Sequence, residues 1–408
     1  MKLLHTADLH LGQHLMFADR KQEHQSFLNW LRDLIINEEI NLLIIAGDIF
    51  DTGTPPNYAL QMYYRFLMEI SQIESCRDVV VIGGNHDSVS TLNAPRDILS
   101  VLNVHVIGGI TENPEDEIII TKDDNGNPTA IICAVPFLND RDVRKSIAGE
   151  SYSEKSQKLM DGIKEHYNLI KEQALTIRSK KNLKVPIIAT GHLFTVGGST
   201  SEGIRDIYVG SLSYFPVTSF PEEFDYIALG HLHKPQIVGN NSKIRYSGSP
   251  IPLSFGEISH PKQVIIYDCS NQEISEIEIP VSRILKQIKG SLTEIEEQIA
   301  ELIKIQKEIW LEIHIIEDEY KGDLSSTIST FVENSELKIF RIIDVKGNFR
   351  KQLMGTEEII PLSEISVIDV FKKRLEAEQS EFDEETKSEL FQMFNETLNE
   401  IYGEKGEN

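Results

Sequence analysis

The chain has 408 residues, of which 40% are hydrophobic, and its formal net charge is -24. This length and composition suffice for two or more domains that each bury a core, and no run of about 18 apolar residues predicts a membrane span. The strong negative charge argues against a protein that holds nucleic acid through a broad basic face of its own.

The spacing of the cysteines and the first five residues indicate the cellular compartment. The three cysteines are widely spaced and include no Cys-X-X-Cys pair, so neither a disulfide framework nor a thiolate zinc site is expected. Residues 1–5 lead directly into a strand and lack a signal-peptide pattern. We therefore expect a cytoplasmic protein.

Residues 1–110 alternate between predicted strands and helices. Apolar runs at 3–7, 42–46, 79–82 and 104–107 predict buried strands, and helical periodicity predicts helices over 21–37, 57–71 and 94–102. This alternation is typical of βαβ units around a largely buried sheet.

The pattern changes after residue 117. Short strands joined by a hairpin turn are expected over 117–135, then a long helix over 153–181 and further strands over 186–279. Two sheets packed together, with helices outside them, are therefore predicted. Residues 281–346 predict a small βαβαβ module, and the acidic residues that follow predict two amphipathic helices.

Polar side chains follow five of the predicted strands, mostly just after a glycine. In open α/β folds, side chains at the carboxyl ends of strands form the functional site. A single polar group of this kind ordinarily belongs to a turn or is a core histidine whose hydrogen bonds are satisfied. Five such groups in one chain are not explained by turn chemistry. The set comprises Asp8, His10, Asp48, Asn85, His192, His231 and His233.

Carboxylate, amide and imidazole groups in this combination suit Mn²⁺, Fe²⁺ or Zn²⁺. Seven ligands exceed the needs of one ion and suit two that share a bridging carboxylate and act together on a phosphate. His86 and Asp51 remain, and a histidine oriented by an aspartate could stabilise a transition state or protonate a leaving alkoxide. The other histidines are interpreted as structural: His5, His14, His24, His105, His166, His260 and His314.

The order Asp-X-His, Gly-Asp-X-X-Asp, Gly-Asn-His-Asp, Gly-His and Gly-His-X-His resembles the signature of the calcineurin-like metallophosphoesterases. Residues 8–12, 191–198, 205–210 and 246–255 further resemble the SbcD family, the nuclease subunits of bacterial SbcCD complexes. The resemblance covers residues 1–280 in its motifs and the remainder in its layout.

This resemblance implies how the site residues divide. One manganese ion would be held by Asp8, His10, Asp48 and His233. The other would be held by Asp48, Asn85, His192 and His231, with Asp48 bridging. His86 would be the catalytic histidine, with Asp51 beside it as the residue that orients it.

The resemblance also implies the fold, α/β (α+β), and three domains. Residues 1–280 would form a nuclease domain, a two-sheet β-sandwich flanked by helices, and 281–346 a small α/β capping domain. Residues 347–408 would form a linker and a helix pair that docks on an SbcC-type ABC ATPase, the alternative being a solvated acidic tail. No Walker A motif occurs, so any ATP dependence must come from that partner.

The implied function is a Mn²⁺-dependent DNA exonuclease and endonuclease that processes double-strand ends and hairpins in repair, recombination and replication. A homodimer within a heterotetramer is implied through the helices at 57–71 and 94–102, although both could simply pack on the sheet. Arg205, Lys234 and Arg245 are candidate phosphate contacts or merely solvated charges. Rival functions are hydrolysis of a small phosphodiester or phosphoprotein, and a scaffold that dimerises the ATPase.

Overall fold

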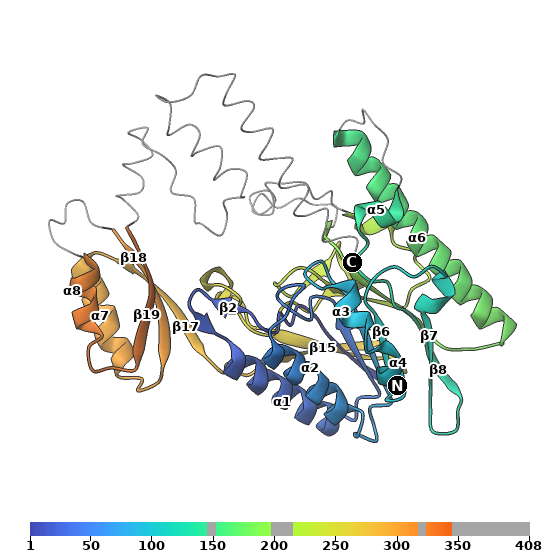
Figure 1. Ribbon diagram of the computed structural model, residues 1–408, viewed down its shortest axis with the longest axis horizontal. Coiled ribbons are helices and arrows are strands. Elements are labelled where there is room, and N and C mark those ends of the chain that lie inside the picture. The colour runs from blue at the N-terminus through green and yellow to red at the C-terminus, as the bar shows by residue number, and fades with distance from the viewer. Residues whose placement is uncertain (145–151, 197–214, 317–323, 345–408) are drawn as a thin grey trace. The chain divides into compact units, whose positions relative to one another are not determined.

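The computed structural model describes residues 1–144, 152–196, 215–316 and 324–344 (Figure 1). The chain divides into two compact units. The first holds described residues within 1–287, 302–312 and 334–340, and the described residues of the second are 288–301, 313–316, 324–333 and 341–344. None of the described helices is both long and apolar enough to cross a membrane.

The first sheet of the larger unit has four parallel strands in its centre and on one side. The strands follow the order β16-β15-β1-β4-β5-β6, and β15 runs antiparallel to both of its neighbours, β1 and β16. Their bounds are β1 Lys2–Thr6, β4 Leu42–Ala46, β5 Asp78–Ile82, β6 Val104–Ile107, β15 Gln263–Asp268 and β16 Glu273–Glu278. Because β1, β4 and β5 are parallel and paired in register, their carboxyl ends meet at one edge of the sheet.

The second sheet follows the order β13-β14-β12-β9-β8-β7. Its bounds are β7 Ile118–Lys122, β8 Pro128–Cys133, β9 Ile187–His192, β12 Tyr226–Gly230, β13 Gln236–Val238 and β14 Asn241–Tyr246. The strands β8, β9, β12 and β14 run parallel to one another. Gly230 at the end of β12 lies opposite His192 at the end of β9, so this sheet also presents its strand ends at one edge.

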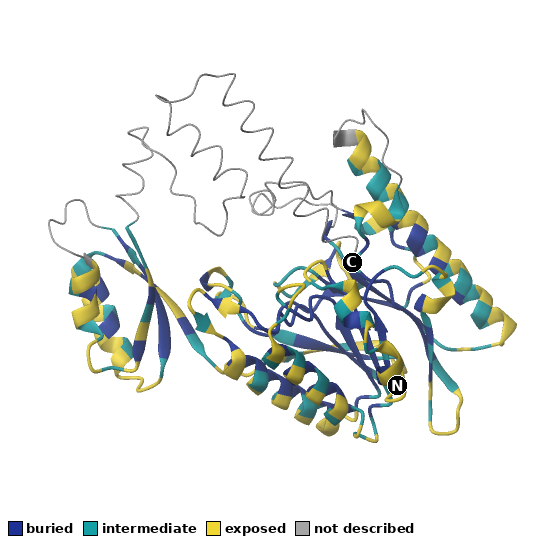
Figure 2. Cartoon of the chain, in the orientation of Figure 1, coloured by how far each residue is buried: buried dark blue, intermediate teal, exposed yellow. Residues whose placement is uncertain are grey.

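The two sheets face each other across a mainly apolar core. Side chains such as Ile44 and Ile82 from the first sheet pack in one cluster with Ile132, Ile188 and Ala228 from the second. The outer faces are covered by α1 (Lys21–Asn37) and α2 (Asn57–Ile70) on the first sheet and by α6 (Tyr152–Lys180) on the second. Figure 2 shows the buried strands between helices whose outer faces are exposed. The predicted fold class, two packed sheets with helices outside, is confirmed.

The helix predicted over 94–102 is present but shorter, as α4 (Arg96–Ser100). A second short helix that was not predicted, α3 (Val89–Asn93), precedes it. Ser88 caps α3 by accepting a hydrogen bond from the Thr91 N–H at 3.3 Å. Pro95 lacks an N–H and separates the two helices. The prediction from apolar periodicity did not take this proline into account.

Several shorter elements complete the larger unit. They are β2 His14–Leu15, β3 Ala18–Asp19, α5 Asp140–Val143, β10 Thr195–Val196 and β11 Phe215–Pro216, with 3-10 turns at Pro114–Glu117, Val217–Ser219 and Phe255–Glu257.

The predicted βαβαβ module is present in its described residues as a three-stranded sheet in the order β17-β18-β19. Its elements are β17 Ile284–Gly290, α7 Leu292–Ile303, β18 Ile309–Ile315, α8 Leu324–Phe331 and β19 Leu337–Asp344. The predicted domain boundaries at 280 and 346 stay a prediction. The two amphipathic helices expected within 347–408 lie outside the described residues.

Candidate metal centre

The polar strand-end residues converge where the carboxyl ends of the two sheets meet. Four of the seven predicted ligands have a left-handed backbone, with φ of 52° at Asp8, 44° at His10, 49° at Asp48 and 100° at His231. This conformation costs free energy in residues with a Cβ, and such strain gathers at functional sites because the surrounding structure imposes it. The site is therefore held in shape by the fold.

Asp48 lies at the centre of the group. Its Oδ1 accepts a hydrogen bond from the His86 backbone N–H at 2.9 Å. Its Oδ2 lies 3.2 Å from His192 Nε2 and 3.5 Å from His10 Nε2. One carboxylate oxygen thus faces an imidazole on either side, which is the position that a bridging ligand needs.

The second ligand group gathers around His192. Its Nδ1–H donates to the Ala46 carbonyl at 2.9 Å, so Nε2 is the nitrogen left to bind a metal. That Nε2 lies 3.1 Å from Asn85 Oδ1, and His231 Nδ1 lies 2.9 Å from the same amide oxygen. His231 is fixed further by its backbone N–H, which donates to Asp8 Oδ1 at 2.8 Å.

The first ligand group contains Asp8, His10 and His233, each of which offers one ligand atom within 4.8 Å of the other two. Asp8 Oδ2 and His10 Nε2 are buried and have no hydrogen-bond partner among the described residues. A buried polar atom without a partner is costly, and a bound cation would satisfy both. The donor set and these two atoms fit a divalent metal ion.

Protonation in the metal-free chain reflects the same crowding. Burial disfavours the imidazolium of His192, but the adjacent Asp48 carboxylate outweighs burial and raises the pKa of His192 to about 9. Burial alone would raise the pKa of Asp48, but the imidazoles of His192 and His10 hold the pKa of this carboxyl well below its usual value. Burial and the neighbouring His192 lower the pKa of His231 to about 3.

Asp51 lies beside His86, as predicted, but contacts it through its backbone. The exposed His86 donates from Nδ1 to the backbone carbonyl of Asp51 at 2.8 Å, while the Asp51 carboxylate lies 3.1 Å from His10 Nδ1. The side chain of Asp51 therefore orients a metal ligand, and only its carbonyl orients His86. The rings of His10 and His86 lie edge to face, 5.0 Å apart.

Two carboxylates that were given no role in the predicted site support it. Asp87 accepts hydrogen bonds from the backbone N–H groups of Ile49, Phe50 and Gly84 at 3.0, 3.0 and 2.9 Å, which joins the loops that carry Asp48 and Asn85. Its position after His86 could have drawn attention to it.

Glu257 is the second, and its Oε1 lies 3.0 Å from His233 Nδ1. Burial would raise the pKa of Glu257, but the hydrogen bond from His233 and the charge of Lys262 lower it to about 2. Nothing in its spacing linked it to His233, 24 positions earlier in the chain.

The three candidate phosphate contacts differ in outcome. Arg245 is buried on β14, where it is ion-paired with Glu276 and donates to the Ser242 carbonyl, so we no longer expect it to contact phosphate. Lys234 is exposed directly after His233 and remains a candidate. Arg205 lies outside the described residues.

Three of the histidines interpreted as structural have partners away from the ligand group. His5 contacts the Tyr226 hydroxyl and the Leu229 carbonyl, and His105 and His166 pair with Asp78 and Glu117. None of the three belongs to either metal-competent cluster that the described residues form.

Fold and donor set together are those of a metal-dependent phosphoesterase. The model of the calcineurin-like phosphoesterase family matches residues 1–235, and that of the type 5 capsule protein repressor C-terminal domain matches residues 281–379. The chain belongs to the calcineurin-like phosphoesterases and, within them, to the SbcD family.

Similar curated proteins are named as the SbcD component of the nuclease SbcCD. The one from Escherichia coli (strain K12) is 40% identical over 99% of both chains. The Bacillus subtilis (strain 168) protein of the same name is 33% identical over 67% of each chain, and the Rhodobacter capsulatus protein is 32% identical over 66% of each.

Proposed function

We propose that this chain is the nuclease subunit of an SbcCD-type complex, a two-metal DNA phosphodiesterase that cleaves double-strand ends and hairpins as exonuclease and endonuclease in DNA repair and recombination. The observation that supports this most is the position of Asp48 Oδ2, 3.2 Å from His192 Nε2 and 3.5 Å from His10 Nε2, among carboxylate, amide and imidazole donors. Relatives over the whole length that are named as nuclease components support the substrate.

Asp8, His10, Asp48 and His233 are proposed to hold one manganese ion and Asp48, Asn85, His192 and His231 the other. When bound, the two ions would supply an activated water and neutralise charge on the phosphate. The chain's own residues do the rest of the positioning. Hydrogen bonds from His192 Nδ1 to the Ala46 carbonyl and from His10 Nδ1 to the Asp51 carboxylate direct both Nε2 atoms inward.

His86 is proposed to act on the substrate itself. Its Nδ1–H is engaged by the Asp51 carbonyl, so Nε2 is the nitrogen that can face a phosphate. There it can stabilise charge on the phosphate oxygens or protonate the leaving alkoxide. Its exposure, in contrast to the buried His10 and His192, suits a residue that meets a macromolecule.

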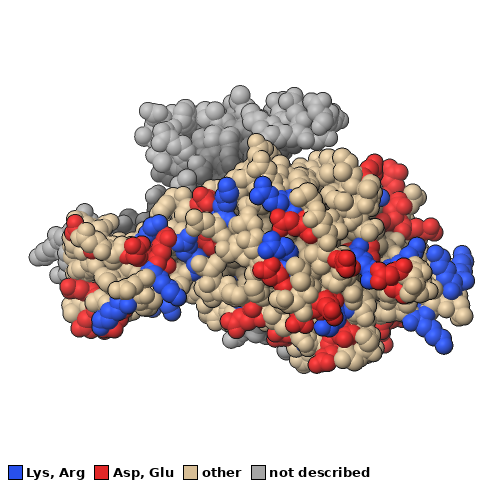
Figure 3. All heavy atoms as spheres, turned by 90° about the horizontal axis from the view of Figure 1, so that it is seen from below, with Lys and Arg blue, Asp and Glu red and all other residues tan. Residues whose placement is uncertain are grey.

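The formal net charge of -24 makes a partner necessary for tight binding of DNA. On the face shown in Figure 3, acidic and basic side chains are interspersed. An ABC-type ATPase of the SbcC class is proposed to hold the DNA and to bind the helix pair within 347–408. A chain that ends at residue 346 should then hydrolyse a model diester but lose stimulation by the ATPase and ATP.

A homodimer in a heterotetramer, located in the cytoplasm, completes the proposal. On α2, Leu67 is buried, whereas Met68 is 48% exposed. Ile98 and Val101, on α4 and directly after it, are 73% and 82% exposed. Large apolar side chains at such exposure favour an interface between two copies.

The test is Mn²⁺-dependent cleavage of an end-labelled hairpin duplex, with and without the partner ATPase and ATP. His86→Gln should abolish cleavage while the bound manganese, measured by mass spectrometry, stays at the wild-type level. If the wild-type chain left DNA intact under every condition yet hydrolysed a small diester, the nuclease proposal would fail. Complementation of a deletion strain by His86→Gln would favour the scaffold role.

A further inference from the structure

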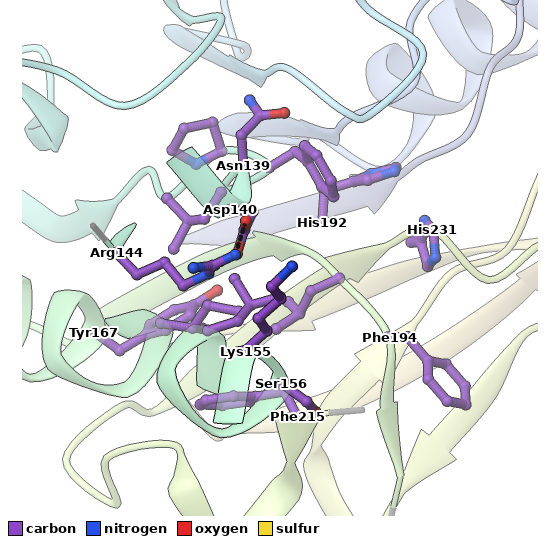
Figure 4. A pocket seen from close by; sticks show the side chains of 16 residues that line it. Asn139, Asp140, Arg144, Lys155, Ser156, Tyr167, His192, Phe194, Phe215 and His231 are labelled. Carbon is purple, nitrogen blue, oxygen red and sulfur yellow. Dashed lines mark hydrogen bonds and ion pairs between the residues drawn. The ribbon is translucent and has the colours of Figure 1, made fainter. Parts of the chain in front are cut away.

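A cavity of about 460 Å³ lies directly beside the candidate metal centre. His192 and His231, both proposed metal ligands, form part of its wall, as Figure 4 shows. The opposite wall comes from α6, through Ser156 and Leu159. Its volume falls in the range of roughly 300–1,000 Å³ that is common for small-molecule sites.

The walls of the cavity are mainly aromatic and aliphatic. The aromatic side chains that line it are Phe137, Tyr167, Phe194 and Phe215. Ile163 and Leu159 add aliphatic surface. Flat apolar walls of this kind accept a planar ring, because stacking and exclusion of water both favour it.

The cavity is rigidly joined to the metal centre. The Phe137 backbone N–H donates to the Gly83 carbonyl at 2.9 Å, in the loop that carries Asn85. The Phe137 ring packs edge to face against the His192 ring, with centroids 6.2 Å apart. Tyr167 donates from its hydroxyl to the Thr190 carbonyl at 2.9 Å, next to the end of β9. A ligand in the cavity is thus held in a fixed relation to a phosphate at the metals.

Two cationic side chains lie at the cavity in a chain of strongly negative charge. Arg144 is ion-paired with Asp140, and in Figure 4 this pair faces the cavity. Lys155 reaches toward it from α6 and is exposed. Both can meet the backbone phosphate of a nucleotide whose base enters the cavity.

We propose that this cavity receives one unpaired nucleobase of the DNA strand, from the nucleotide next to the phosphate that is cleaved. The inference rests on the proposed nuclease function and specifies its substrate: the strand is separated from its complement at the cut. Every base has a stacking face, so the site would be tolerant of sequence. Hairpin loops and frayed ends present such bases without the cost of opening a duplex.

The first test needs no variant. The wild-type chain is given single-stranded oligonucleotides that carry one abasic nucleotide at successive positions, and cleavage is mapped at each bond. The bond next to the abasic nucleotide should be cut about tenfold more slowly, the loss expected for one stacked base. Equal rates at all positions would overturn the proposal.

The second test fills the cavity with Leu159→Trp, and Leu169→Trp on the exposed face of the same helix is the control. Leu159→Trp should slow DNA cleavage about tenfold more than it slows hydrolysis of methyl p-nitrophenyl phosphate, which has no base. It should also lose the sensitivity to the abasic nucleotide, whereas Leu169→Trp keeps it.

If the chain's own residues fill the cavity, Leu159→Trp will slow the cleavage of DNA and of the small diester to the same extent. That outcome refutes the base-binding proposal but not the nuclease function, because the wild type still cleaves DNA. A wild type that hydrolyses only the small diester refutes the nuclease function and this inference together.

Discussion

Replacement of Glu257 by glutamine tests whether a carboxylate outside the ligand set controls a metal ligand. Glu257 Oε1 lies 3.0 Å from His233 Nδ1, and Oε2 accepts hydrogen bonds from Lys262 Nζ at 2.7 Å and from the Leu253 N–H at 3.2 Å. The carboxylate therefore holds the proton on Nδ1 and leaves His233 Nε2 to bind the metal. Glutamine keeps the size and loses the charge.

The expected loss can be estimated from both contacts. Glutamine keeps only one acceptor oxygen, so it cannot accept from both His233 Nδ1 and Lys262 Nζ. Changing the hydrogen-bond partner of a metal-bound histidine lowers metal affinity by about 10–100-fold, or about 1.4–2.7 kcal/mol. Lys262 is 7% exposed and would keep its bonds to the His233 carbonyl and Ser249 Oγ at 3.0 and 2.8 Å. Its charge would nevertheless lose its partner, which costs about 3 kcal/mol of folding free energy.

The assay is calorimetric titration of the metal-free chain with Mn²⁺, alongside urea unfolding. One of two manganese affinities should fall in Glu257→Gln, and both should stay in Glu69→Gln, where a surface glutamate paired with Arg32 is changed. Lys262→Met separates the effects, because it breaks the ion pair but leaves the hydrogen bond between Glu257 Oε1 and His233 Nδ1. A folded Glu257→Gln chain with both wild-type manganese affinities would refute the reasoning.

Three further predictions concern the loops, the core and the dimer. A Cβ on Gly84 would lie 2.2 Å from Asp48 Oδ1, so Gly84→Ala should destabilise the fold by about 1–3 kcal/mol and weaken Mn²⁺ binding. Gly53→Ala is the control, because its Cβ would have no neighbour nearer than 3.7 Å. Calorimetric titrations with Mn²⁺ that are the same for both variants would contradict this. Burial lowers the pKa of His5 to about 3, below its unfolded value of 6.5. The free energy of unfolding should therefore be highest above pH 6.5 and should fall below that pH, by about 2 kcal/mol at pH 5. In urea unfolding, His5→Gln should show a flatter dependence of this free energy on pH than the wild type, and the same dependence in both would refute the prediction. Val101→Asp should weaken the dimer about tenfold in sedimentation experiments, and no change would exclude this surface.

Much of the site could be predicted because of how parallel strands end. The run before Asn85 is apolar and β-branched, and the runs before Asp48 and Asp8 are mainly apolar, so they predict buried strands. Parallel strands in register bring their carboxyl ends to one edge. Ligand types at those ends therefore predicted a cluster of donors before any contact was known.

The bounds of one helix were misjudged although the signal was present. The apolar periodicity predicted a helix over 94–102, but Pro95 cannot donate a backbone hydrogen bond, and the helix begins only after it, at Arg96. The serine at 88 that caps the first short helix was also legible in the sequence.

The sequence by itself determined the fold class, the donor types and the order in which they occur along the chain. These depend on periodicity and on residue chemistry, which are local properties. Only the tertiary structure decided that the Asp51 carboxylate meets His10, that Glu257 holds His233 and that Arg245 is buried against Glu276. Such pairs join residues 24 to 41 positions apart through loops whose paths are set by packing, so no spacing rule can specify them.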